Sequence, residues 1–366
     1  MTRRKNIKRF GGEAGSGDQE NGIQRINMIS GYLKEMFGEK VVKLSLDGNF
    51  TCPNRDGSKG VGGCIFCSAG GSGEFAGSIP SQIELLSSKW PRAKYIAYFQ
   101  NHTNTYAPVS ELREKFYAAL AYGSSANFNS CFCGGSSETV CMDAEHSEIV
   151  GLAIATRPDC LNDEIYELLA ELSQKTFLWV ELGLQSMHDE TGNTINRCHS
   201  LEVYDEAAAR LAALGIRTVT HLIFGLPKSI GADGSVIPET REEMLESVRH
   251  VCRALPCSAS GTENISNGAN KHIFGIKLHM LNVVRGSQME HLCPNYVPFS
   301  SIGEYTDLVV DALKIIPRDI TVHRMSADAP RSILIAPEWS YKKRTILNEI
   351  HRKMAERDIY QGQNAE

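Results

Sequence analysis

The chain has 366 residues, of which 22% are charged, and its formal net charge of −5 gives no overall signal for nucleic-acid binding. No run approaches the ~18 apolar residues of a membrane span, and no apolar segment follows the basic start MTRRKNIKRF. We therefore expect no membrane insertion and a cytoplasmic protein, whose eleven cysteines serve metals or catalysis rather than disulfides. Organellar import stays an alternative, because five of the first nine residues are basic.

Short apolar runs alternate with amphipathic helical patterns after residues 1–22, which are typical of a disordered tail. The expected strands are 41–46, 95–100, 150–156, 176–185, 217–226 and 274–284. Helical patterns at 161–172 and 201–214 lie between them, and capping-box spacing predicts further helix starts at Thr240 and Ser301. This repetition predicts parallel strands joined by crossover helices, hence an α/β fold with a partial (β/α)6 TIM-like barrel.

We expect the barrel to span 23–313 and a C-terminal α/β extension to span 314–366. Three Ser/Gly/Asn-rich insertions interrupt the barrel at loop positions: 123–148, 229–238 and 257–271. The first contains four residues that could hold a second metal: Cys131, Cys133, Cys141 and His146. The surrounding composition favours a mobile loop with free thiols instead.

Three cysteines share one loop after the first predicted strand: Cys52, Cys64 and Cys67, called here the cluster cysteines. Gly and Asn residues between them let the backbone wrap closely around a metal group. A structural zinc site needs a fourth ligand, so a Cys₃His site with a distant histidine is one alternative. Buried, unligated thiols are another, but a Gly-rich loop is unlike a core. A four-iron cluster with three thiolate ligands and one open iron fits better.

The Cys-x11-Cys-x2-Cys spacing resembles that of radical S-adenosylmethionine (SAM) enzymes, and its width, with Phe66 before the last cysteine, is similar to the branch of the elongator catalytic subunit. Seven ordered blocks are similar to a family whose better-understood members act on the wobble uridine of tRNA: DGNFTCPNRDG, YFQNHTNTYAP, ATRPDC, WVELGLQS, HLIFGLP, IKLHMLNVVRG and HRMSADAPR.

This resemblance implies a [4Fe–4S] cluster on the cluster cysteines, with SAM on the open iron. It also implies reductive cleavage of SAM to a 5′-deoxyadenosyl radical, with an electron donor such as flavodoxin or ferredoxin. We assign SAM contacts to residues in the cysteine loop and near strand ends: Phe66, Gln100, Thr103, Arg157, Glu181, Gln185 and Gly225. Alternatives are loop packing for Phe66, a salt bridge at the rim for Arg157, and hydrogen bonding within the barrel for Glu181 and Gln185.

The C-terminal segment changes character, since residues 314–357 contain ten Lys or Arg against five Asp or Glu. Lys342, Lys343 and Arg344, called here the basic triplet, open a predicted helix. Such charge is usually a solvated helix face, yet it also suits the phosphates of an RNA substrate. Three residues of the block HRMSADAPR are placed near substrate: His323, Arg324 and Arg331.

We therefore expect a radical SAM enzyme that modifies the wobble uridine of tRNA, converting a carboxymethylaminomethyl group towards aminomethyl. A radical SAM enzyme for a small molecule or peptide is an alternative, and so is a zinc-dependent RNA-binding module without catalysis. Cys198 stands where we would expect glycine, and the sequence gives no functional account of it.

Overall fold

The computed structural model describes residues 24–365, except 69, 72, 74, 124–148, 256–271 and 328. The predicted tail, the insertion 257–271 and nearly all of 123–148, with its three cysteines and histidine, therefore lie outside the described residues. The remaining insertion, 229–238, overlaps an antiparallel pair formed by β6 (Pro227–Ile230) and β7 (Val236–Pro238).

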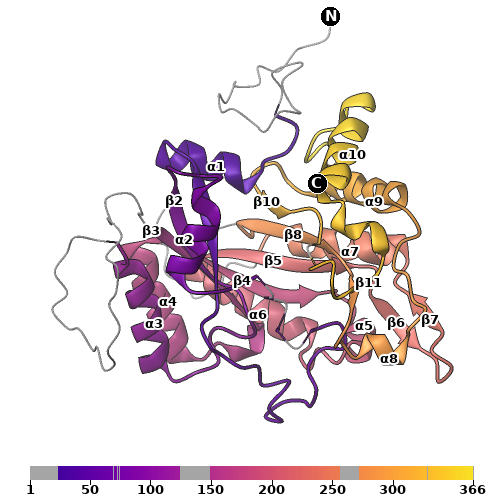
Figure 1. Cartoon of the computed structure of the whole chain (residues 1–366), viewed down its shortest axis with the longest axis horizontal. Helices are drawn as coiled ribbons and strands as arrows, with labels where there is room; N and C mark the ends of the chain where they lie inside the picture. Colours follow the sequence, from indigo (N-terminus) through magenta and orange to yellow (C-terminus); the bar gives the residue numbers. More distant parts are fainter. Residues whose placement is uncertain are drawn as a thin grey trace, which may run out of the picture.

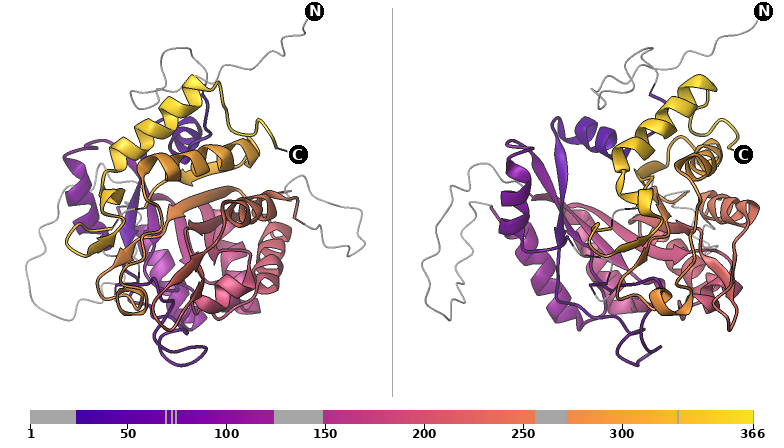
Figure 2. Two further views of the ribbon diagram at one scale, coloured as in Figure 1. Left: turned by 90° about the vertical axis from the view of Figure 1, so that its right-hand side faces the viewer. Right: turned by 45° about the vertical axis from the view of Figure 1, so that its right-hand side comes forward.

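Seven parallel strands form one curved sheet in the order β1-β2-β3-β4-β5-β8-β10 (Figures 1 and 2). Their bounds are β1 (Val41–Leu46), β2 (Lys94–Phe99), β3 (Ile149–Thr156), β4 (Phe177–Gln185), β5 (Arg217–Phe224), β8 (Gly275–Met280) and β10 (Thr321–Arg324). The partial α/β barrel is confirmed.

Two details differ from the sequence expectation. The run 274–284 breaks after β8, and β9 (Val283–Val284) pairs with β11 (Leu334–Ala336) in a separate antiparallel sheet. A seventh strand, β10, pairs with β8 although it lies within the predicted C-terminal extension. A run of four residues is too short to stand out in the sequence, so it is the pairing with β8 that makes it a strand. The domain boundary at 313 stays a prediction.

Helices alternate with the strands and cover the outer face of the sheet (Figure 2). The longer ones are α3 (Val109–Ala121), α4 (Asp163–Lys175), α6 (Leu201–Ala213), α7 (Arg241–Cys252), α9 (Ile302–Ile315) and α10 (Lys343–Glu356), and the shorter ones are α1 (Ile29–Phe37), α2 (Ile79–Ser87), α5 (Asp189–Thr194) and α8 (Met289–Leu292). The predicted helix starts are confirmed: Thr240 and Glu243 form a complete capping box, and Ser301 accepts a hydrogen bond from the N–H of Glu304.

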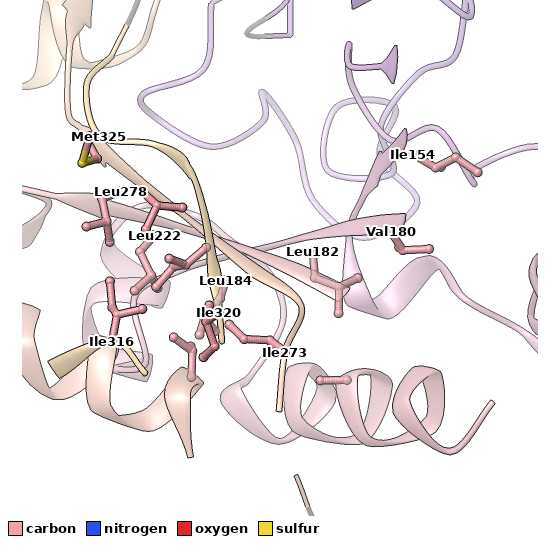
Figure 3. Packing of buried hydrophobic residues seen from close by; sticks show 14 of the residues in the cluster. Ile154, Val180, Leu182, Leu184, Leu222, Ile273, Leu278, Ile316, Ile320 and Met325 are labelled. Carbon is pink, nitrogen blue, oxygen red and sulfur yellow. The ribbon is translucent and has the colours of Figure 1, made fainter. Parts of the chain in front are cut away.

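The side chains of β4 alternate between the outer and the inner face of the sheet. Val180, Leu182 and Leu184 point outward and belong to the core between sheet and helices (Figure 3). The intervening residues, among them Trp179 and Glu181, point into the barrel because successive side chains of a strand lie on opposite faces. Any polar residue at an inward position therefore faces the barrel interior.

The N-terminal mouth of the barrel is closed by α1. Ile29 and Leu33 of this helix pack against Val41, Ile96 and Trp179 from the sheet, and α1 contacts both β1 and β10. The loops that follow the strands lie at the opposite, C-terminal mouth of the barrel, which α1 does not cover, and can form a site there. In the described part of the chain, no helix has the length and apolarity needed to cross a membrane.

Candidate active site

A cavity of about 430 Å³ opens at the C-terminal ends of the strands, and all three cluster cysteines line it. Residues from all seven strands of the main sheet line the same cavity: Ser45, Tyr98, Ala155, Thr156, Glu181, Gly183, Gln185, His221, Ile223, Lys277, His279, Met280 and Arg324. The expectation that the thiols gather at the end of the barrel where parallel strands terminate is therefore met.

The cluster loop is folded by its own backbone and fixed to the barrel at two points. Within the loop, the N–H of Cys67 donates to the carbonyl of Cys64 at 2.9 Å, and Gly63, with φ +80°, donates its N–H to Asn54 at 2.7 Å. Ile65 then joins the loop to the residue after α5 and to α8, through hydrogen bonds of 3.1 Å with Ile195 and Met289. The backbone that carries the three thiols is therefore fixed by hydrogen bonds to both Ile195 and Met289.

The donor set fits an iron–sulfur cluster. The cluster cysteines form no disulfide. Burial, together with the neighbouring thiols of Cys67 and Cys52, raises the pKa of the Cys64 thiol to about 12. A thiolate in such a place needs a positive partner, and iron coordination would displace that proton.

The zinc alternative finds no support in the ligand geometry. Among the described residues, no three His, Cys, Asp or Glu side chains gather closely enough to hold one metal ion. A four-iron cluster is less demanding, because each cysteine binds a separate iron and the thiolates stand further apart.

The Asn54 side chain is hydrogen-bonded to the sulfur of Cys64. It is fully buried, its Nδ2 donates to the sulfur of Cys64 at 3.6 Å, and its Oδ1 accepts from the thiol of Cys198 at 3.1 Å. Cys198 has φ +61°, in the left-handed region that favours glycine, which gives a backbone reason for the residue expected at that position. In the structure, Cys198 therefore contacts the same Asn54 amide that donates to Cys64.

Gln185 has the features of a ligand-binding side chain. It lies at the end of β4 with φ +65°, a strained conformation for a residue with a side chain. Its amide folds over Gly183, where an added Cβ would lie 2.5 Å from Nε2. Its Oε1 is buried without a hydrogen-bond partner. A donor such as the ammonium group of SAM would satisfy that oxygen.

Glu181 is instead held by the barrel. The Tyr98 hydroxyl donates to its Oε2 at 2.6 Å, the Trp179 indole donates to its Oε1 at 2.9 Å, and Lys277 forms an ion pair with it. Burial favours the neutral carboxyl, but Lys277, Lys43 and His323 outweigh that effect and hold the pKa of Glu181 well below its usual range. Glu181 lines the cavity, yet its oxygens already have partners, as the alternative of hydrogen bonding within the barrel anticipated.

Three other assigned residues line the cavity: Phe66, Gln100 and Thr103. Arg157 also reaches it, but its guanidinium is paired with Asp159 through two bonds of 2.9 Å. Burial alone would lower the pKa of Arg157, and these bonds raise it above its usual value instead. Lys59 of the cluster loop pairs with the same carboxylate at 2.8 Å, so Asp159 ties the loop to the end of β3.

Of the other assigned residues, Arg324 lines the cavity, whereas Gly225 and His323 are not among the described residues that line it. Gly225, with φ +84°, forms a turn packed on Pro298 and Phe299. His323 is buried between Trp179 and Phe274, with ring centroids 5.4 and 5.7 Å away. Their assigned roles stay predictions.

The C-terminal basic residues separate into two groups. Arg331 and the basic triplet are exposed, and the guanidinium of Arg331 lies 4.5 Å from the centroid of the Tyr341 ring. Further along α10, by contrast, Arg352 pairs with Glu349 and Glu356, and two more basic residues, Lys353 and Arg357, pair with Asp307 of α9. These pairs fasten α10 internally and to α9, so the exposed cationic surface is smaller than the charge count suggests.

The sequence analysis missed most of a polar layer inside the barrel, called here the inner wall: Tyr98, Glu181, His221, Lys277, His279 and Arg324. Only Glu181 and Arg324 had been singled out. The signal was present in the strand IKLHM, where Lys277 and His279 occupy alternate positions of an otherwise apolar run. Alternate polar residues in a buried strand indicate an inward polar face.

A parallel partial barrel that brings three cysteines, none of them in a disulfide, and polar side chains to one cavity is the framework of an iron–sulfur enzyme. Comparison with protein families gives the class: residues 56–232 match the radical SAM superfamily, and residues 273–356 match the radical SAM C-terminal domain. The chain belongs to the radical SAM superfamily, whose enzymes use a [4Fe–4S] cluster and SAM.

Two of the relatives cover nearly all of the chain. It is 38% identical to the "Uncharacterized protein YtqA" of Bacillus subtilis, over 93% of both chains. It is 33% identical to "Protein YhcC" of Escherichia coli, over 91% of this chain and 94% of that protein. A tRNA uridine(34) acetyltransferase of Dehalococcoides mccartyi is 27% identical over 54% of this chain and 38% of its own length.

Among solved structures, archaeal Methanocaldococcus infernus Elp3 shares the fold. The TM-score is 0.56, with 17% sequence identity, covering 88% of this chain and 64% of that one.

Proposed function

We propose that this radical SAM enzyme modifies the wobble uridine of tRNA and converts a carboxymethylaminomethyl substituent towards aminomethyl. The observation that carries the proposal is the similarity to a tRNA uridine(34) acetyltransferase, since uridine 34 is the wobble position. The exposed basic triplet adds support. It does not line the cavity, so it can bind tRNA phosphates while the cavity binds the uridine.

In this proposal, different parts of the chain bind the cluster, orient SAM and shield the reaction from water. The cluster cysteines hold the cluster, and Gln185 orients SAM through its unpartnered oxygen. When bound, the cluster and SAM supply a one-electron cleavage that yields a hydrogen-abstracting radical. The cavity at the barrel end keeps water and other hydrogen donors away from the reacting carbon. A small reductant protein, such as a flavodoxin or ferredoxin, delivers the electron.

Mass spectrometry of tRNA nucleosides tests the proposal. Cells without the protein should accumulate carboxymethylaminomethyluridine and lose the nucleosides derived from aminomethyluridine. Cys64→Ala should fail to restore them, whereas Cys252→Ala, in the buried face of α7 away from the cavity, should restore them. Unchanged wobble nucleosides in the deletion strain would overturn the tRNA proposal and direct attention to a small-molecule or peptide substrate.

A further inference from the structure

Tyr341 is an exposed aromatic residue with basic side chains against its ring. It ends the short 3₁₀-helix η3 (Glu338–Tyr341), directly before the basic triplet, and it is 42% exposed. The guanidinium of Arg331 lies 4.5 Å from the centroid of its ring, and Nζ of Lys342 lies 5.9 Å from that centroid. A flat ring and a flat guanidinium are therefore presented together on the surface.

The charge around this ring is positive. Residues 331–348 contain four basic residues, which are Arg331 and the basic triplet, and one acidic residue, Glu338. All five of these charged residues are exposed. A surface of this kind suits a partner that carries both negative charge and flat apolar faces, as a nucleic acid does.

The residues directly before Tyr341 are fixed to the protein core. The ring of Trp339 packs against Tyr305 of α9, with centroids 6.3 Å apart, and Ser340 is buried. The N–H of Lys342 donates to the carbonyl of Trp339 at 3.0 Å. The backbone of Tyr341 is therefore held in place, so little conformational freedom is lost when a partner binds its ring.

The Tyr341 surface lies close to the rim of the cavity. Ala327 and Ala329, which follow β10, line the cavity, and Arg331 comes two residues later. Two residues span at most ~7 Å, so Arg331 lies beside the rim. In addition, η3 contacts β11, which pairs with β9, and Val284 of β9 lines the cavity.

We propose that Tyr341 and Arg331 stack against an unpaired base of the anticodon loop, next to the uridine that enters the cavity. The inference rests on the proposed function and names the surface on which the RNA lies. Unpaired RNA bases are bound by stacking on aromatic rings or on guanidinium planes, and both are present here. The basic triplet would bind the phosphates of the same loop, whereas Tyr341 selects a loop over a duplex, whose bases are already stacked on one another.

Fluorescence anisotropy with the cluster-loaded enzyme tests this proposal. One RNA is an anticodon stem-loop with carboxymethylaminomethyluridine at position 34, and the other is the same stem as a duplex without the loop. Tyr341→Ala should weaken binding of the stem-loop about 5- to 100-fold, as the loss of one stacked base would give. Binding of the duplex should be unaltered, and so should the salt dependence of stem-loop binding, because no phosphate contact is lost. Tyr341→Phe keeps the ring and should bind the stem-loop as wild type does.

Tyr360→Ala is the matched control. Tyr360 is 40% exposed, and the guanidinium of Arg318 lies 5.7 Å from the centroid of its ring, but neither residue is among the described residues that line the cavity. This variant should bind both RNAs as wild type does. Iron content and circular dichroism establish that each variant is folded.

Three results would each overturn the stacking proposal: stem-loop binding that Tyr341→Ala leaves unaltered, an equal loss for stem-loop and duplex, or no stem-loop binding by wild type. The tRNA proposal is decided separately, by the wobble nucleosides of the deletion strain. Unchanged nucleosides together with a loop preference that depends on Tyr341 would support the stacking surface and assign it to a different RNA.

Discussion

Replacing Glu181 by glutamine should show that this carboxylate stabilises the barrel rather than contacting SAM. The ion pair with Lys277 is buried, with side-chain exposures of 4% for Lys277 and 3% for Glu181. Glutamine keeps the shape and can still accept from Trp179, but it leaves the ammonium group without a counterion. Breaking a buried pair in this way costs ~3–5 kcal/mol, a large part of the ~5–15 kcal/mol that stabilises a typical domain.

A double-mutant cycle measures the effect through urea unfolding of the cluster-loaded enzyme, followed by circular dichroism. Adding Lys277→Met to Glu181→Gln should recover at least ~2 kcal/mol of the summed single losses, because the uncompensated charge disappears. Glu242→Gln is the control. It breaks the exposed pair with Arg249 and should cost less than ~1 kcal/mol. A Glu181→Gln enzyme that is as stable as this control, yet binds SAM weakly, would refute the reasoning and restore Glu181 to the SAM site.

Four further predictions use other parts of the site. Replacing the cluster cysteines by alanine should abolish the brown colour and the binding of about four irons per chain, as measured by iron analysis. Asn54→Leu should keep the irons but make the midpoint potential in an EPR titration more negative by about 20–40 mV, because losing a hydrogen bond to Cys64 sulfur destabilises the reduced cluster by about 0.5–1 kcal/mol. Burial, with nearby Lys277, lowers the pKa of Lys43 from 10.5 to about 7, so the unfolded chain binds more protons between these values and stability should rise with pH there. Lys43→Met should remove up to ~1.4 kcal/mol per pH unit from that slope in urea unfolding, and an unchanged slope would contradict the shift. Changing the basic triplet to serine should weaken tRNA binding and flatten its log–log salt dependence by up to about three contacts, each worth ~0.7–0.9, while SAM cleavage without substrate is unaltered; an unchanged slope would place the tRNA contact elsewhere.

The C-terminal segment shows where a count of charges misleads. The sequence predicted a basic helical face for RNA, and the exposed triplet agrees with that prediction. Arg352 and Lys353, however, form ion pairs within α10 and with Asp307 of α9. Those acidic partners were visible in the sequence, but their pairing depends on how two helices pack, which helical periodicity alone does not reveal.

What the sequence by itself determined is local in origin. The spacing of Cys52, Cys64 and Cys67 predicted the cluster loop, and the alternation of apolar runs with helical patterns predicted the parallel sheet. The structure confirms the sheet and places the three thiols in one cavity, because a loop motif and a strand pattern are each encoded within a few tens of residues; their role as cluster ligands stays a prediction.

Only the tertiary structure decided what each inward side chain meets. Glu181 and Lys277 are separated by 96 residues and come together because β4 and β8 flank β5 in one curved sheet. The same curvature brings Tyr98 and Arg324, from distant strands, into one cavity. A residue's strand and face follow from local pattern, but its partner across the barrel depends on strand order, register and closure, which no short segment specifies.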